Sequence, residues 1–136
     1  MKNINCFKAY DIRGSVPEEL NENIAYLISR AFIEFTNAKN VVLGMDIRIS
    51  SEKIKGSIID GITDSGSDII DIGLVGTEVV NFTTSYGNFD GGIMVTASHN
   101  PPNYNGMKIV RKDSKPISEN TGLKEIKTIA ERNNFK

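Results

Sequence analysis

The sequence has 136 residues, 39% of them hydrophobic and 24% charged, which is typical of one globular domain that buries its own core. The formal net charge is −1, so composition excludes a strongly basic surface of the kind that binds nucleic acid or an anionic membrane. No apolar run approaches the length of a membrane span, and no apolar signal region begins the sequence, so we expect a cytoplasmic protein.

Cysteine and histidine are each present once, as Cys6 and His99. A single cysteine excludes an internal disulfide. One cysteine and one histidine far apart in the sequence also lack the ligand spacing of a zinc site. We therefore expect neither a disulfide nor zinc to hold this fold together.

The first unusual segment is residues 7–14, where Tyr10, Asp11 and Arg13 lie close together before a glycine that permits a turn. Composition alone favours a surface loop with a local ion pair between Asp11 and Arg13. The functional alternative is an arginine that binds an anion, because the planar guanidinium donates two hydrogen bonds at once to a phosphate.

A long helix is predicted to begin at Pro17, because a proline and two acidic residues suit a helix N-terminus. Apolar residues then recur at helical spacing as far as Phe35, so one face of this helix packs on a core. A polar break separates it from a short apolar strand at residues 40–45.

A second helix follows, with Ser50 or Ser51 as its cap and residues 65–67 as its end. A short helix through about Ser85 is predicted with Thr77 as its cap, and the last helix begins at Ser118 and uses a stripe of apolar residues. The remaining strands are predicted at residues 68–72, 92–96 and 106–111.

This alternation of strands and helices predicts an α/β fold, a three-layer sandwich with helices on both faces of a four-stranded, mostly parallel sheet. The strand at 106–111 follows a loop without a helix, so it should join antiparallel, as an edge strand. No repeat or second core pattern is visible, and residues 1–136 are expected to form a single domain.

The loop between the last two strands contains Ser98, His99 and Asn100, followed by two prolines. Each proline fixes its own φ and pushes the preceding residue towards an extended conformation, so the loop is stiff. The Asn105–Gly106 pair that follows is a strong turn signal. A serine presented on such a loop at the end of a buried strand suggests a nucleophile or a carrier of phosphate.

A serine hydrolase is a poor interpretation of this loop. Adjacent side chains on an extended segment point to opposite sides, so His99 is badly placed as a base for Ser98. The Gly-x-Ser-x-Gly pattern of a nucleophile elbow is absent, because Thr96 and Asn100 take the glycine positions. No second histidine exists to complete a triad.

Three stretches carry a resemblance to one family. Residues 96–101, Thr-Ala-Ser-His-Asn-Pro, resemble the phosphoserine loop of the α-D-phosphohexomutases, and residues 105–108 resemble that family's Asn-Gly-x-Lys element. Residues 7–14 are similar to the N-terminal motif of its bacterial phosphomannomutase/phosphoglucomutase branch. The motifs follow the family's order and spacing. The resemblance covers essentially the whole chain, but only the first domain of a four-domain enzyme.

The resemblance implies a role for each matched residue. A phosphorylated Ser98 would donate its phosphoryl group to a sugar phosphate, Lys108 would act as an acid or base, and His99 would support them. Arg13 would contact the phosphoserine region, with Tyr10 lining the site and Asn100 binding phosphate. Without the resemblance, Lys108 is an ordinary strand lysine and Asn100 a loop side chain that bonds to its own backbone.

Residues 44–48 match the family less completely. The family usually shows Gly-Arg-Asp-x-Arg here, and this chain has Met45 in place of the first arginine. The departure puts any role of position 45 in doubt. Asp46 and Arg48 remain matched, and we expect them to hold the loops of the site in place.

The implied cofactors are Mg²⁺ and a hexose 1,6-bisphosphate activator, and the implied substrate is a hexose phosphate. A phosphorylated Ser98 would supply one hard oxygen ligand to Mg²⁺. The family takes its other ligands from an Asp-Gly-Asp-x-Asp loop in its second domain, and this chain has no such run. The remaining domains of the parent are therefore expected partners, and the isolated chain is expected to be inactive.

Two alternatives stay open. The chain could be a non-catalytic binding module on the same fold, because a fold alone never establishes an activity. It could also come from a phosphoglucosamine or phosphopentose mutase, because the family's sugar-contacting loop lies in a domain outside this sequence. The sequence of residues 7–14 favours the phosphomannomutase/phosphoglucomutase branch.

Overall fold

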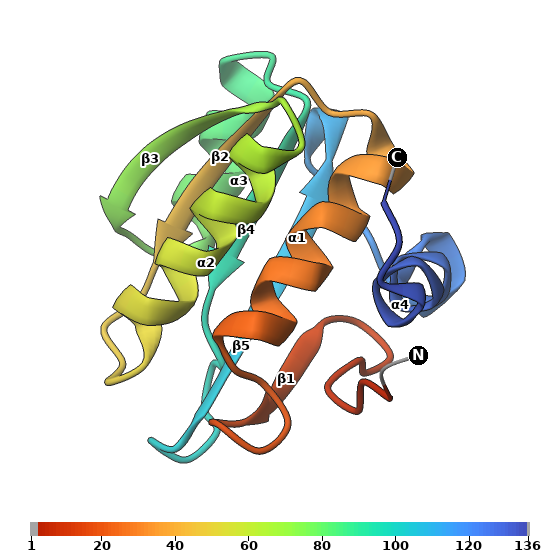
Figure 1. Ribbon diagram of the computed structural model, residues 1–136. Helices are drawn as coiled ribbons and strands as arrows, with labels where there is room; N and C mark the ends of the chain where they lie inside the picture. The colour runs from red at the N-terminus through yellow and green to blue at the C-terminus, as the bar shows by residue number, and fades with distance from the viewer. Residues whose placement is uncertain (1–2, 136) are drawn as a thin grey trace.

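The computed structural model describes residues 3–135, and a mixed β-sheet lies at its centre with helices on both faces (Figure 1). The strand order is β1-β5-β4-β2-β3, and the short β6 pairs with β5. The central strands β2, β3 and β4 run parallel, whereas β5 runs antiparallel to β4 and to β1. The strands are β1 Ile12–Ser15, β2 Asn40–Met45, β3 Asp68–Leu74, β4 Gly91–Val95, β5 Tyr104–Arg111 and β6 Lys115–Pro116.

The predicted α/β three-layer architecture is confirmed, and all four predicted strands are present as β2 to β5. The strand count was too low, because β1 and β6 were missed. β1 pairs with β5, with Arg13 opposite Gly106, so β5 is antiparallel as predicted but is not an edge strand. β1 contains one apolar residue, Ile12, and its partner lies far along the chain, so no local pattern marks it as a strand.

The turn predicted at Asn105–Gly106 is wrong, because both residues are buried within β5. The Asn105 Nδ2 donates to the hydroxyl oxygens of Ser50 and Ser51, at 2.9 and 3.1 Å. Gly106 allows β1 and β5 to approach each other closely, because a Cβ at this position would lie 2.1 Å from the carbonyl oxygen of Ile12. The Asn-Gly pair therefore serves strand packing here and not chain reversal.

The four α-helices of the described chain are α1 Glu22–Thr36, α2 Ser51–Asp64, α3 Thr77–Tyr86 and α4 Leu123–Arg132. The first helix was predicted to begin five residues too early, since Pro17 lies in a turn. Its true cap is Asn21, whose side chain accepts a hydrogen bond from the Ile24 amide. Ser118 caps a short 3₁₀ turn that precedes α4.

Helix caps elsewhere also differ from prediction. Ser50 occupies the N-cap position of α2, as one of the two predicted serines, but makes no capping hydrogen bond, and its hydroxyl accepts from Asn105. Gly76, and not Thr77, occupies the N-cap position of α3. No helix within residues 3–135 combines the length and the apolar character that a bilayer crossing would require.

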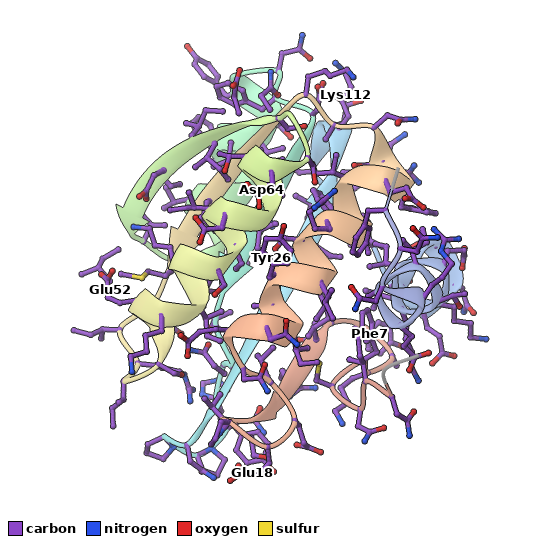
Figure 2. The ribbon with its side chains drawn as sticks, in the orientation of Figure 1. Phe7, Glu18, Tyr26, Glu52, Asp64 and Lys112 are labelled. Atoms are coloured by element: carbon purple, nitrogen blue, oxygen red, sulfur yellow. The ribbon has the colours of Figure 1, made fainter. Side chains whose placement is uncertain are left out.

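Two apolar cores lie on opposite faces of the sheet. The larger one is enclosed by α1, α2 and α4, and its buried side chains include Phe32, Ile58 and Ile93. Figure 1 shows α1 and α2 side by side over this face, and Figure 2 shows Tyr26 and Asp64 where the two helices meet. The Tyr26 hydroxyl donates to the Asp64 carboxylate at 2.7 Å.

The smaller core lies under α3 and consists of Val42, Val80 and Met94. Lys108 is directly opposite Met94 in the β4–β5 register, so it lies on this same face. Arg13, opposite Gly106, shares that face two positions further along β5. The face that α3 covers in part is therefore the one that carries the cationic residues singled out by sequence.

Candidate active site

Ser98 lies on the loop that joins β4 to β5, residues 96–103, which we call the serine loop. Its side chain is exposed, as predicted. The segment is a turn and not extended as we had assumed, with the Asn100 amide donating to the Ala97 carbonyl at 3.0 Å. Ser98 has a φ of +54°, a left-handed conformation that is uncommon outside glycine and clusters at functional sites.

Thr96 connects the Ser98 backbone to the end of β2. The Thr96 Oγ1 accepts a hydrogen bond from the Ser98 amide at 3.0 Å and donates one to the Asp46 carboxylate. The Asp46 amide in turn donates to the Val95 carbonyl at 3.0 Å. The start of the serine loop is therefore anchored to the loop that follows β2.

Arg48 holds the rest of the serine loop through backbone carbonyls. Its Nη2 donates to the backbone carbonyl oxygen of Ser98 at 2.6 Å. Its Nη1 lies within 2.9–3.1 Å of the carbonyl oxygens of Asn100, Pro101 and Tyr104. The side chain is only 12% exposed, and its Nε lies 3.9 Å from the Asp46 carboxylate. The expectation that Asp46 and Arg48 hold the loops in place is confirmed.

Arg13 reaches the same loop from β1. Its Nε donates to the Asp11 carboxylate at 2.9 Å, which is the predicted local ion pair. Its Nη1 donates to the Asn100 side-chain oxygen at 3.0 Å. The structure therefore brings Arg13 and Asn100 together at the serine loop. The side chain of Asn100 accepts its hydrogen bond from Arg13 and not from its own backbone.

Lys108, His99 and Tyr10 do not touch Ser98 through any hydrogen bond or ion pair among the described residues. Lys108 is half-buried in β5, and its ammonium has no carboxylate partner within residues 3–135. His99 is exposed beside Ser98, and Tyr10 is 83% exposed. Their catalytic and binding roles remain predictions.

A hollow of about 440 Å³ lies beside the serine loop, and sequence reasoning did not foresee it. Two of its walls are Ile47 and Ile49, which are 87% and 93% exposed. The available signal was the apolar–polar alternation around Arg48 in the loop after β2. The hollow is lined by Asp46, Ile47, Arg48, Ile49, Asn100 and Pro102.

The described residues fit a divalent metal only in part. No group of three acidic, histidine or cysteine side chains gathers as a possible metal cluster within residues 3–135. Ser98 could contribute a hard oxygen only through a phosphate on its hydroxyl. Any other ligands would have to come from outside this part of the chain.

Fold and site together define an α/β/α domain that presents a serine on a loop fixed by an arginine, with a second arginine in contact with the same loop. The family model described as phosphoglucomutase/phosphomannomutase, alpha/beta/alpha domain I, matches residues 5–136. The chain belongs to this family, and the resemblance found in its motifs is confirmed.

Individual relatives agree with this assignment. A phosphomannomutase of Escherichia coli is 55% identical over 99% of this chain, which covers 30% of that relative. A phosphomannomutase of Klebsiella pneumoniae is 54% identical, and the chain covers 86% of it. A crystal structure of a phosphoglucomutase/phosphomannomutase family protein from Burkholderia thailandensis superposes with a TM-score of 0.88 at 33% identity, over 98% of this chain and 32% of that one. The chain therefore spans about a third of the Escherichia coli and Burkholderia proteins.

Proposed function

We propose that this chain is the phosphoserine-bearing domain of a phosphomannomutase/phosphoglucomutase that interconverts hexose 1-phosphate and hexose 6-phosphate. The observation that carries the proposal is the exposed, left-handed Ser98 on a loop tied down by Arg48, in a chain that belongs to this family. A serine whose backbone is held in this way, with its side chain exposed, suits a group that carries a phosphoryl.

The reaction has two phosphoryl transfers. A free hydroxyl of the sugar phosphate attacks the phosphorus on Ser98 and gives its proton to a base, while the bond from phosphorus to Ser98 Oγ breaks and Oγ takes up a proton. The resulting hexose bisphosphate turns over in the site. Ser98 Oγ then attacks the other phosphate and gives up its proton, while the bond from phosphorus to the sugar oxygen breaks and that oxygen takes up a proton. Most of the rate in such transfers comes from positioning and electrostatic stabilisation.

Arg13 is the residue we assign to the phosphate on Ser98. Two of the five guanidinium donors are used, one by Asp11 and one by Asn100. The side chain is 38% exposed, so its other donors can face a phosphate beside the loop. Asn100 would keep the guanidinium at the loop, and Tyr10 would line the opening of the site.

Lys108 is the residue we assign to proton transfer, with His99 in a supporting role. Lys108 lies on the same face of the sheet as Arg13 and has no carboxylate partner within residues 3–135. An ammonium without a partner is available to a reacting oxygen, and side chains placed in this way contribute to proton transfer.

Mg²⁺ would stabilise negative charge on the phosphoryl group as it transfers. A phosphate on Ser98 is the one ligand that we assign to it from the described residues, so we derive no step through the metal. Further metal ligands, the sugar-reading loop and the clamp for the distal phosphate would come from the rest of a protein as long as the relatives. By this proposal the 136-residue chain folds by itself but has no mutase activity.

The first experiment charges the complete enzyme with glucose or mannose 1,6-bisphosphate, followed by intact mass measurement and peptide mapping. We expect one phosphate on Ser98. The Ser98→Ala variant should lose both the phosphate and turnover and keep its melting temperature, because removing a loop hydroxyl opens no core cavity. Ser118→Ala, a control outside the serine loop, should keep both the phosphate and turnover, although it loses the cap of the 3₁₀ turn. Phosphate on Ser50, Ser51 or Ser118 would reject the assignment.

The second experiment tests the isolated chain. A coupled assay contains purified chain, glucose 1-phosphate, the activating bisphosphate and Mg²⁺, and a thermal melt is recorded beside it. We expect a cooperative melt and no turnover. Robust turnover would show that no other domain is needed. Glucosamine and pentose phosphates in the assay of the complete enzyme test the two neighbouring mutase activities.

A further inference from the structure

We propose that Arg48 is a positioning residue that fixes the conformation of the serine loop and is not itself a ligand of any phosphate. The inference rests on the proposed function of Ser98 as phosphoryl carrier. It assigns different work to the two arginines that reach this loop, Arg48 and Arg13.

The hydrogen bonds of Arg48 are directed to the backbone. Both terminal nitrogens point at carbonyl oxygens of the serine loop and of Tyr104 at the start of β5, and Nε faces Asp46. Pro101 has no N–H, so the Ser98 carbonyl cannot accept the hydrogen bond of a regular turn from residue 101. The loop keeps turn hydrogen bonds of its own, to the carbonyls of Ala97 and Pro101. The Arg48 guanidinium supplies the donor that the Ser98 carbonyl would otherwise lack. With both terminal nitrogens bonded to backbone carbonyls and its side chain 12% exposed, Arg48 is less available to a phosphate than Arg13.

Arg13 contrasts with Arg48 at each of these points. Its contacts are two side-chain oxygens, those of Asp11 and Asn100, and none of them is a loop carbonyl. Its side chain is 38% exposed, about three times the fraction of Arg48. Arg13 is therefore the more accessible of the two to a phosphate beside the loop, whereas Arg48 is engaged by the carbonyls of the loop itself.

The positioning acts on Ser98 from both of its peptide groups. Arg48 holds the Ser98 carbonyl at 2.6 Å, and Thr96 holds the Ser98 amide at 3.0 Å. A non-glycine residue in the left-handed region is less stable than in the ordinary regions and persists only when its surroundings fix it. Together Arg48 and Thr96 select this conformation, and with it the direction of the Ser98 Oγ.

Loss of this positioning should lower kcat and leave substrate binding intact. A displacement of a reacting group by about 1 Å can cost on the order of 100-fold in rate. We therefore expect Arg48→Lys to lower kcat about 100-fold with KM unchanged within about 3-fold, because the substrate's own contacts stay in place. Arg13→Lys should instead raise the KM for the hexose bisphosphate, because the phosphate that Arg13 contacts on Ser98 belongs to the bisphosphate between the two transfers.

The experiment uses the complete enzyme charged with glucose 1,6-bisphosphate and follows the phosphoserine by ³¹P NMR beside steady-state kinetics. Wild type should give one sharp phosphoserine signal. Arg48→Lys should shift or broaden this signal and lower kcat. Thr96→Val, which removes the acceptor for the Ser98 amide, should do the same. Arg111→Lys, at the far end of β5, is the control for losing an arginine and should match wild type.

Each outcome decides the proposal. An unchanged ³¹P signal and kcat in Arg48→Lys overturns it, and so does a rise in KM like that of Arg13→Lys, which would make Arg48 a phosphate ligand. If Arg48→Lys has no cooperative melt, Thr96→Val decides by the same readouts. A wild-type enzyme without a phosphoserine signal overturns the proposed function and this inference together, whereas a normal wild-type signal with an insensitive variant overturns the inference alone.

Discussion

The two faces of the sheet differ in what they bury. The face under α1 and α2 is covered by a continuous apolar core, which includes Phe32, Leu43 and Ile93. The face under α3 buries a cluster of Val42, Val80 and Met94, and beyond α3 it carries polar side chains. The first face supplies most of the stability, and the second supplies the groups that we assign to chemistry.

One strand can serve both faces because successive side chains alternate between them. In β5, Met107 and Ile109 point into the large core, and Lys108 between them points to the other face. Lys108 therefore lies on the face opposite the large core, and its substitution should leave the packing of that core intact. Variants on the two faces should therefore separate activity from stability.

The largest effect should come from Lys108→Met, which removes the ammonium and keeps the apolar stem. We expect kcat of the complete enzyme to fall by about 100- to 10,000-fold, the usual contribution of a positioned acid or base. The free energy of unfolding should change by no more than about 0.5 kcal/mol. Steady-state kinetics and urea denaturation measure the two quantities. Loss of stability with activity retained would make Lys108 an ordinary strand lysine.

On the other face, Phe32→Ala should lower the free energy of unfolding by about 3–5 kcal/mol, because Phe32 is wholly buried and the cavity cannot close fully. The matched control is Phe82→Ala on α3. Phe82 is 65% exposed and stacks on Tyr86, so its loss should cost at most about 1 kcal/mol. Urea denaturation compares the two. Similar costs would contradict the view that stability is concentrated under α1.

Where β1 and β5 meet, Gly106→Ala should lower the free energy of unfolding by about 1–3 kcal/mol. The added Cβ would meet two backbone carbonyl oxygens, those of Ile12 and Thr96, and neither can move without breaking the sheet. Gly56→Ala is the control, because a Cβ on Gly56 in α2 meets nothing within 4 Å. It should raise stability by about 0.5–1 kcal/mol through helix propensity. Thermal melts that rank the two variants in the opposite order would refute the close approach.

The parts of the fold that sequence predicted are those with a local period. β2 and β4 are apolar runs, and α1 repeats apolar residues at helical spacing, so each could be found without knowing its partners. β1 could not, because its strand character comes from pairing with β5. The start of α1 was misplaced by the proline signal at Pro17, although Asn21 and Glu22 offered a better cap and first turn.

At the site, sequence motifs predicted which residues matter but not how they meet. The exposed position of Ser98 followed from its neighbours, because the buried strand before it and the prolines after it are adjacent in sequence. The hydrogen bonds of Arg48 to the serine loop and Tyr104 join residues that are 50 to 56 positions apart in the sequence. They depend on the parallel pairing of β2 with β4, which brings the ends of the two strands together. The motif around Thr96 gives no sign of the hydrogen bond that its hydroxyl accepts from the Ser98 amide, because that bond depends on the turn of the folded loop.

The smallest effect concerns Cys6, which is wholly buried against the large core. Burial raises the pKa of the Cys6 thiol to about 12. In the unfolded chain the thiol ionises near pH 8.5, so above that pH the unfolded state loses a proton that the folded state keeps. Stability should therefore fall with rising pH, by at most roughly 1.4 kcal/mol per pH unit from this group.

Cys6→Ala removes this dependence and so isolates it from other groups that titrate at alkaline pH. At pH 7 the variant should be less stable than wild type, because the alanine leaves a small cavity. Between pH 8.5 and 10 the difference should narrow, since only wild type pays the cost of keeping its thiol protonated. Urea denaturation at each pH measures the gap. A constant gap would mean that the thiol ionises equally in both states, and that the large core is wetter at its N-terminal edge than its apolar lining indicates.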